Sequence, residues 1–212
     1  MREPSLDPDR RRFMLLALVA PVVFAAGLRL RWPGDAAAAD SAASRTLAPT
    51  PECGDDDEPT HQTTEGPFFK PRSPLRTNLL EPGIDGRRLV ATGRVFSVGC
   101  QPLAGALIDF WQASAEGEYD NVGFKLRGHQ FTDREGRWRL ETVVPGLYPG
   151  RTRHIHVKVQ ARHGTPLTTQ LFFPCEARNR KDFIFDPELL MAVRPQGDRS
   201  EARFHFVLPA GS

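Results

Sequence analysis

Short stretches of alternating apolar and polar residues recur along the chain after about residue 60. The clearest covers residues 153–160, where Ile155, Val157 and Val159 alternate with His154 and His156. An alternation of period two predicts a half-buried β-strand with its apolar side chains on one face and its polar side chains on the other. Six more segments of strand character lie between turn signals: residues 88–98, 104–113, 127–132, 137–144, 167–173 and 203–208.

One segment has helical character. Residues 186–193 read DPELLMAV, with Asp186 as the expected N-cap and Pro187 at the first helical position. The chain also holds 18 glycines and 19 prolines, a content that favours many turns and short strands. We therefore expect an all-β fold, a β-sandwich of mostly antiparallel short strands with at most one short helix.

The chain divides into three parts. Residues 1–39 read as a twin-arginine signal segment, because Arg10, Arg11 and Arg12 precede an apolar run over residues 13–28 and small residues follow, with Ala39 a plausible last residue of the signal. The apolar run is shorter than the ~20 residues that span a bilayer. Residues 40–60 are expected to form a flexible acidic linker and residues 61–212 the catalytic domain. These features predict export by the twin-arginine machinery to the periplasm or the outside of the cell; whether the signal is cleaved stays open.

The distribution of charge and the number and spacing of the cysteines limit the partners, disulfides and metal sites that we expect. The formal net charge of +2 is carried by residues 1–39, with six arginines and four acids, so the body of the chain is balanced and gives no case for nucleic-acid binding. The three cysteines, Cys53, Cys100 and Cys175, allow one disulfide and one free thiol, and all three pairings stay open. Their wide spacing matches no zinc motif.

Candidate metal ligands stand out by their scarcity. The chain has two tyrosines, Tyr119 and Tyr148, against 14 phenylalanines, and Tyr148 lies six residues before the His154-Ile-His156 pair. Residues i and i+2 of a strand lie ~6.6 Å apart on one face, so two imidazoles there can converge on one ion. Taken alone, a His-x-His pair is more often solvent-facing or structural. Two phenolates with two imidazoles form a hard, anionic donor set, which points to ferric iron.

Four segments carry a resemblance to a known family. TEGPFF (residues 64–69), PLAGALIDFWQASAEGEYD (102–120), TDREGRWRLETVVPGLYPGRTRHIHVKV (132–159) and TTQLFF (168–173) occur in the order seen in the intradiol ring-cleavage dioxygenases. The sequence thus resembles the family of catechol 1,2-dioxygenase and protocatechuate 3,4-dioxygenase. It is most similar to its small, exported, single-chain members.

The resemblance implies specific roles. Fe(III) would be held by Tyr119, Tyr148, His154 and His156, and the substrates would be a catechol and dioxygen. Cleavage of the ring between its two hydroxylated carbons would give a muconate-type diacid. Tyr148 would leave the iron and accept a substrate proton, whereas Tyr119 would stay bound. The matching segments imply two further catalytic residues, Arg151 and Gln170. They also imply, with weaker support, that Thr64, Gly66 and Pro67 line the substrate pocket.

The sequence also departs from the family pattern. Phe68 and Phe69 replace a tyrosine pair, and Gly150 stands where protocatechuate enzymes have a bulky residue, so we expect an open pocket with looser substrate choice. For Trp111, a role in core packing is as good an explanation as a role near the site. The helical dimerisation region of catechol 1,2-dioxygenases is missing, so a homo-oligomer is neither implied nor excluded.

Two other functions stay open at this level. His154 and His156 could hold zinc and a hydrolytic water, although phenolates are poor substitutes for the usual third ligand. Alternatively, the chain is an exported prealbumin-like β-sandwich binding module with a vestigial metal site. Red-brown colour from phenolate-to-iron charge transfer would separate iron from both.

Overall fold

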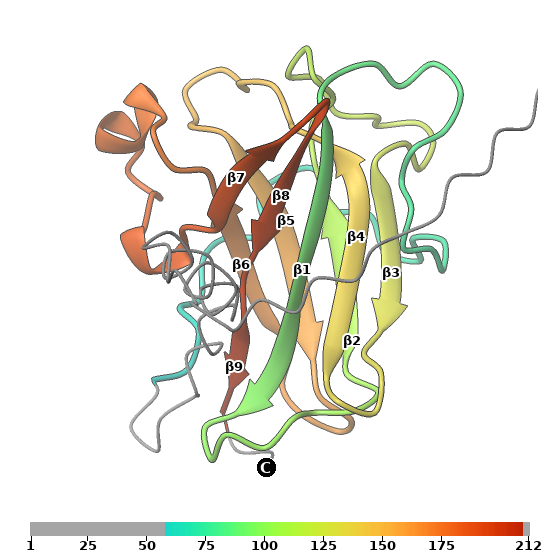
Figure 1. Cartoon of the computed structure of the whole chain (residues 1–212), viewed down its shortest axis with the longest axis vertical. Coiled ribbons are helices and arrows are strands. Elements are labelled where there is room, and N and C mark those ends of the chain that lie inside the picture. Colours follow the sequence, from blue (N-terminus) through green and yellow to red (C-terminus); the bar gives the residue numbers. More distant parts are fainter. Residues whose placement is uncertain (1–57, 210–212) are drawn as a thin grey trace, which may run out of the picture. The chain divides into compact units, whose positions relative to one another are not determined.

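A computed structural model describes residues 58–209 of the chain (Figure 1). The predicted signal segment, Cys53 and nearly all of the predicted linker lie outside this range. Nine strands and two short 3-10 helices follow one another: β1 Arg88–Ser97, β2 Leu107–Trp111, β3 Arg127–Phe131, β4 Arg137–Val143, β5 His154–Gln160, β6 Leu167–Phe172, η1 Ala177–Lys181, η2 Pro187–Leu189, β7 Ala192–Gln196, β8 Arg199–Arg203 and β9 Phe206–Leu208.

The strands form two sheets packed face to face (Figure 1). One sheet has the order β4-β1-β8-β7, with β9 also paired to β1, and the other has the order β3-β2-β5-β6. Adjacent strands are antiparallel except that β8 and β9 run parallel to β1. The predicted all-β sandwich is therefore confirmed.

The core lies between the sheets. Ile155, Val157 and Val159 of β5 are fully buried and belong to the same apolar cluster as Leu89 and Leu140 from the other sheet. Because strand side chains alternate between faces, His154 and His156 must lie on the opposite face of β5. The alternation in the sequence thus sets both the core and the position of the histidines.

The expected helix at residues 186–193 is much shorter in the structure. The Asp186 side chain accepts a hydrogen bond from the Glu188 N–H, as the cap predicts, but the helical turn η2 ends at Leu189. The next residues are extended, because the Met191 N–H donates to the Phe172 carbonyl at 3.0 Å. Pairing with a neighbouring strand thus overrides the helical pattern, and the chain continues into β7, a strand the sequence did not predict.

Two further features complete the description. No helix within residues 58–209 is long and apolar enough to cross a bilayer. Cys175 is a free, exposed thiol and Cys100 is disulfide-bonded, which removes the pairings that involve Cys175.

Candidate metal centre

Strand β5 brings the two histidines together. His154 and His156 are 4% and 2% exposed, and their Nε2 atoms lie 3.1 Å apart. Strand β5 is an inner strand of its sheet, so both side chains have neighbours on either side. In the register of the sheet, His156 lies opposite Trp111 of β2 and Gln170 of β6.

A row of four cross-strand partners therefore crosses the sheet: Arg127, Trp111, His156 and Gln170. Direct partners on neighbouring strands point to the same face. The indole of Trp111 stacks on the His156 ring, with 4.9 Å between centroids and 7° between planes. Trp111 is thus packing, as one interpretation of the sequence held, but its contact is with a candidate ligand.

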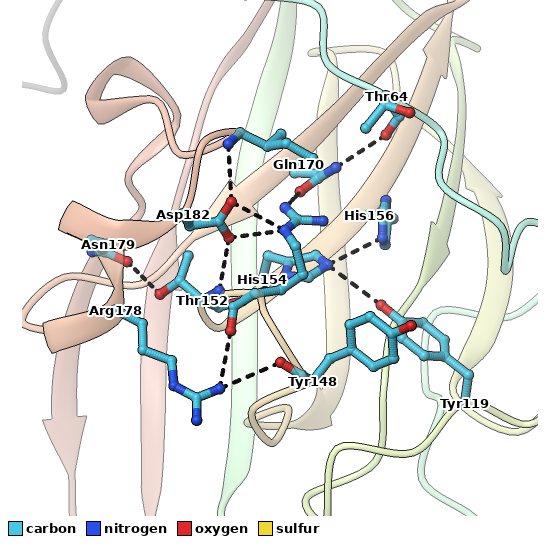
Figure 2. A network of polar contacts seen from close by, with 12 residues as sticks. Thr64, Tyr119, Tyr148, Thr152, His154, His156, Gln170, Arg178, Asn179 and Asp182 are labelled. Atoms are coloured by element: carbon cyan, nitrogen blue, oxygen red, sulfur yellow. Dashed lines mark hydrogen bonds and ion pairs between the residues drawn. The ribbon is translucent and has the colours of Figure 1, made fainter.

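The two tyrosines come from two loops that lie next to each other, Tyr119 from the loop between β2 and β3 and Tyr148 from the loop between β4 and β5. The Tyr119 hydroxyl lies 3.5 Å from His154 Nε2, and Figure 2 shows this phenol and the His156 ring directed at the same nitrogen. The Tyr148 ring meets the Tyr119 ring edge-on, at 5.9 Å and 81°. Phe68 stacks on Tyr119 at 4.2 Å between centroids. The structure thus gathers all four predicted metal ligands in one place.

The tyrosine loops are held against each other by backbone contacts. The Gly146 N–H donates to the Ser114 carbonyl at 2.7 Å, and the Gly117 N–H donates to the same carbonyl at 3.0 Å. A Cβ on Gly146 would lie 2.3 Å from the carbonyl oxygen of Ala115, so only glycine allows this approach. The close packing fixes the loop of Tyr119 beside the loop of Tyr148.

Both imidazoles are neutral at pH 7. Burial is the main cause that lowers the pKa of His154 to about 4, and burial likewise lowers the pKa of His156 well below its usual value, with smaller contributions from His154 and Arg151. His154 Nδ1 lies 2.7 Å from the Thr152 carbonyl oxygen, which can only accept, so Nδ1 carries the proton and Nε2 presents its lone pair to the site.

This arrangement fits a metal ion. Two adjacent nitrogen ligands at 2.0–2.1 Å from an ion stand about 3 Å apart, close to the separation of the two Nε2 atoms. Burial raises the pKa of Tyr119, against the opposing charges of Arg151 and Arg127. A phenol in such a place ionises when a cation binds its oxygen. Within residues 58–209 no group of three or more His, Cys, Asp or Glu side chains is placed to hold a metal ion, so the tyrosines are needed for a four-donor site.

Arg151 and Gln170 lie together beside the histidines. Arg151 Nε donates to both oxygens of Asp182 at 2.9 and 3.1 Å, and its Nη2 donates to Gln170 Oε1 at 2.5 Å. Gln170 Nε2 in turn donates to the Thr64 carbonyl at 3.0 Å (Figure 2). The Arg151 side chain is 13% exposed, so its pair with Asp182 is not a surface salt bridge.

Asp182 is the residue that holds Arg151 in place, and no motif in the sequence indicated this role. Its carboxylate also accepts from the backbone N–H groups of Thr152 at 2.7 Å and Ile184 at 2.9 Å. Burial alone would raise the Asp182 pKa, but these N–H groups and the Arg151 guanidinium lower it below its ordinary value. The neighbouring Arg153 pairs with Glu176 at 2.6 Å and also donates from Nη1 to the Pro145 carbonyl, and it contacts neither Asp182 nor Gln170.

The segment that precedes the sheets covers the site. Gly66, at φ +69°, lies against His156, where an added Cβ would sit 3.3 Å from Cε1. Of the other predicted pocket residues, Thr64 contributes its carbonyl to Gln170, and Pro67 is exposed beside Phe68. The segment therefore approaches the candidate ligands through its backbone as well as its side chains.

Arg127 is a second residue that the sequence analysis missed. It is 1% exposed, and its guanidinium donates to the Phe68 carbonyl at 2.6 Å and twice to the Asp120 carbonyl, at 3.0 and 3.3 Å. It thereby joins the segment that carries Phe68 to the loop that carries Tyr119. Its position at the start of a strand gave no sign of this role.

Known proteins resemble this chain in sequence and in fold. A family profile described as dioxygenase matches residues 64–209. The chain is 36% identical over 118 residues to the protocatechuate 3,4-dioxygenase beta chain of Burkholderia cepacia, which covers 47% of this chain and 50% of that protein. It is 32% identical over 163 residues to catechol 1,2-dioxygenase 2 of Acinetobacter lwoffii, with 64% and 59% covered.

A solved structure is more similar. The dioxygenase domain of a dioxygenase–carbohydrate-binding protein fusion from Streptomyces sp. SirexAA-E is 55% identical, with a TM-score of 0.71, and the match covers 73% of this chain and all of that one. The chain spans about half the length of the first curated relatives it matches. Because the family profile matches most of the sequence and these relatives share its fold, the chain belongs to the intradiol dioxygenase family.

Proposed function

We propose that this protein is a ferric intradiol dioxygenase that cleaves catechol-type rings between the two hydroxylated carbons. One observation supports the proposal: the Nε2 atoms of two neutral imidazoles, His154 and His156, lie 3.1 Å apart beside the Tyr119 hydroxyl, and the Tyr148 ring packs against the Tyr119 ring. Fe(III) would be held by Tyr119, Tyr148, His154 and His156, since hard phenolate oxygens favour a highly charged ion over zinc.

Bound Fe(III) would supply a Lewis-acidic centre for both catechol oxygens and make the ring reactive toward dioxygen. In the overall reaction, one catechol and one dioxygen give one muconate-type diacid, with both oxygen atoms retained. The protein's part is to bind the substrate, orient it and manage its protons and charge.

Tyr148 is the proposed proton acceptor. Its hydroxyl has no hydrogen-bond partner among the residues described, whereas Tyr119 is packed under Phe68 and lies next to His154. A phenolate at Tyr148 could therefore take a substrate proton at its oxygen without breaking a hydrogen bond within residues 58–209, although its ring packs edge-on against Tyr119 and Phe68. Tyr119 is the better fixed of the two and would keep its place.

Arg151 is the proposed partner for negative charge that develops on the substrate ring. Asp182 fixes its Nε side, and Nη2 reaches Gln170, so the guanidinium plane is oriented before substrate arrives. A preoriented cation in a site of low polarity stabilises developing charge strongly. Gln170 holds this plane from the other side and ties it to Thr64.

Export through the twin-arginine pathway is part of the proposal. It rests on Arg10, Arg11 and Arg12 ahead of the apolar run, all outside the described residues. That pathway moves folded proteins, which suits a protein whose metal is loaded in the cytoplasm. Replacing the three arginines with lysine should leave a metal-loaded precursor in the cytoplasm; normal export of this variant would refute the assignment.

The central experiment measures iron, colour and oxygen uptake together. The purified protein should hold about one iron per chain, absorb visible light and consume dioxygen with catechol while a diacid forms. Tyr119→Phe and Tyr148→Phe should each shift the absorption band, because each removes one phenolate and keeps the ring. An unchanged band in both variants would falsify the tyrosinate assignment, and a colourless zinc protein would refute the iron.

Arg151→Lys tests the second part of the site against a matched control. Arg153→Lys alters the neighbouring arginine, which pairs with Glu176. Arg151→Lys should keep the iron and the colour but lower kcat, because a point charge lacks the planar fork that meets both Asp182 and Gln170. Arg153→Lys should turn over at close to the wild-type rate. Equal rates for the two variants would remove Arg151 from the mechanism.

A further inference from the structure

A cluster of arginines lies on the outer face of the sheet that does not carry the histidines. On this sheet Arg94 of β1 is directly opposite Arg137 of β4, and Thr92 of β1 lies between Arg139 and Arg203. Like charges on directly opposed strand positions repel one another. Such a face therefore costs free energy unless counter-charges are present.

Carboxylates neutralise part of this cluster. Arg137 and Arg139 of β4 have acidic partners at 3.0–3.8 Å: Asp133, Glu135 and Glu141. The guanidinium groups of Arg94 and Arg203 have no hydrogen-bond or ion-pair partner among residues 58–209. Two arginines of the cluster are thus available to a ligand.

The arginines surround a cleft of about 560 Å³, which we call the arginine cleft. This volume suits a small ligand. Its wall includes six residues that carry N–H donors: Arg94, Arg137, Arg139, Arg203, Trp138 and His205. Asp133 is the acid in the wall, so the cleft has an excess of positive charge.

One buried ring nitrogen in this wall, Nε2 of His205, has no acceptor within residues 58–209. His205 Nδ1 accepts from the Arg94 backbone N–H at 3.1 Å, so the proton of the neutral ring is on Nε2. Burial lowers the His205 pKa, with help from Arg203 and Arg94, so the ring stays neutral at pH 7.

An unpaired buried donor is costly, because it lacks an acceptor. The His205 N–H can be satisfied by an oxygen that brings a lone pair. The same oxygen would be attracted by the two unpaired guanidinium groups, whose planar fork matches carboxylate and phosphate. The unpaired guanidinium groups and the unpaired N–H donor therefore both favour a ligand with negatively charged oxygens.

We propose that the arginine cleft is a binding site for an oxyanion, the carboxylate or phosphate group of a small ligand. Arg94 and Arg203 bind its charge, and His205 donates to one of its oxygens after a small movement of the cleft wall. The site lies across the sandwich core from His154 and His156, so it does not depend on the proposed ring cleavage.

The test is calorimetric titration of the full chain with inorganic phosphate and, separately, with succinate. Wild-type protein should bind at least one of the two in the millimolar range or tighter, and the preferred ion tells phosphate from carboxylate ligands. Arg94→Gln/Arg203→Gln should weaken binding at least tenfold. Arg88→Gln is the matched control, since it removes a charge from the same face of β1 outside the cleft, and it should bind like wild type.

His205→Phe separates a site with a specific donor from a general electrostatic attraction. It keeps an aromatic ring and removes the Nε2–H, so the affinity should fall by about threefold to tenfold, which corresponds to the usual free energy of one hydrogen bond. Absence of heat with both ions, equal weakening in Arg88→Gln, or unchanged affinity in Arg94→Gln/Arg203→Gln would each overturn the proposal. Circular dichroism and melting of every variant confirm that the sandwich is intact.

Discussion

Replacing Arg127 with methionine should destabilise the protein more than the loss of any exposed arginine. The Arg127 guanidinium makes three hydrogen bonds to two backbone carbonyls, those of Phe68 and Asp120. In Arg127→Met both carbonyls lose a charged donor in a buried place. At about 1–3 kcal/mol for each unsatisfied group, the cost is about 2–6 kcal/mol.

A second effect reduces this number. Arg127 is 1% exposed and has no salt bridge to a carboxylate within residues 58–209, so its burial carries a desolvation cost that methionine avoids. Burial also lowers the Arg127 pKa, which has the same origin. We therefore expect the lower part of the range, about 2–3 kcal/mol, still a large share of the 5–15 kcal/mol typical of a domain.

Urea denaturation of the metal-free protein, followed by circular dichroism, measures this effect apart from any change in iron binding. Arg127→Lys keeps the charge and one donor group, so it should lose about half as much free energy of unfolding. Arg139→Met is the control, because Arg139 is 53% exposed and pairs with Glu141, and it should change stability by no more than about 0.5 kcal/mol. If Arg127→Met and Arg139→Met unfold at the same urea concentration, the two carbonyls do not need the guanidinium and the reasoning fails.

Three further substitutions test other contacts of the site. Asp182→Asn should keep the iron but lower kcat by roughly tenfold or more, because the Arg151 plane loses its charged anchor; an oxygen electrode measures this, and wild-type turnover would refute it. Gly66→Ala should lower the free energy of unfolding by about 1 kcal/mol, since φ is +69° and the new Cβ meets the His156 ring at 3.3 Å; an unchanged melting temperature would contradict this. Burial raises the pKa of Asp109, so the ionised carboxylate lowers stability at pH values above its pKa in the folded protein and has no such effect below its pKa in the unfolded protein. Asp109→Asn should therefore have a higher melting temperature than wild type at pH 7 and the same melting temperature at pH 3. A difference in melting temperature that persists at pH 3 would exclude burial as the cause.

Most of the strands could be predicted because apolar residues that become buried alternate with polar residues along them. In β5 the fully buried Ile155, Val157 and Val159 alternate with polar residues, and the predicted strand differs from the observed one by a single residue. Strand β8 was missed except for its last residue, Arg203, where the predicted segment 203–208 begins. Strand β7 was missed entirely because it has no such pattern. All of its residues are at least partly exposed, and it contains Pro195, which suits the edge position it occupies in its sheet.

The residues that hold the site in place could not be predicted from the sequence, for a different reason. Asp182 contacts Arg151 across 31 residues of sequence, and Arg127 contacts the Phe68 carbonyl across 59. Neither has a fixed spacing to a ligand, and an isolated aspartate or arginine in a sequence is most often solvated. Long-range hydrogen bonds to backbone groups leave no periodicity and no motif. These residues therefore become visible only when the sheets and loops are folded together.

The register of β5 links the predicted part of the site to the part that was missed. A shift of this strand by one residue would send His154 and His156 into the apolar core and Ile155 to the face of Trp111. The alternation that buries the isoleucine thus excludes every register shifted by an odd number of residues from the observed one, which pairs His156 with Trp111 and Gln170. That pairing covers the imidazole and lowers its pKa, so the neutral nitrogen a metal requires follows from the same pattern that builds the core.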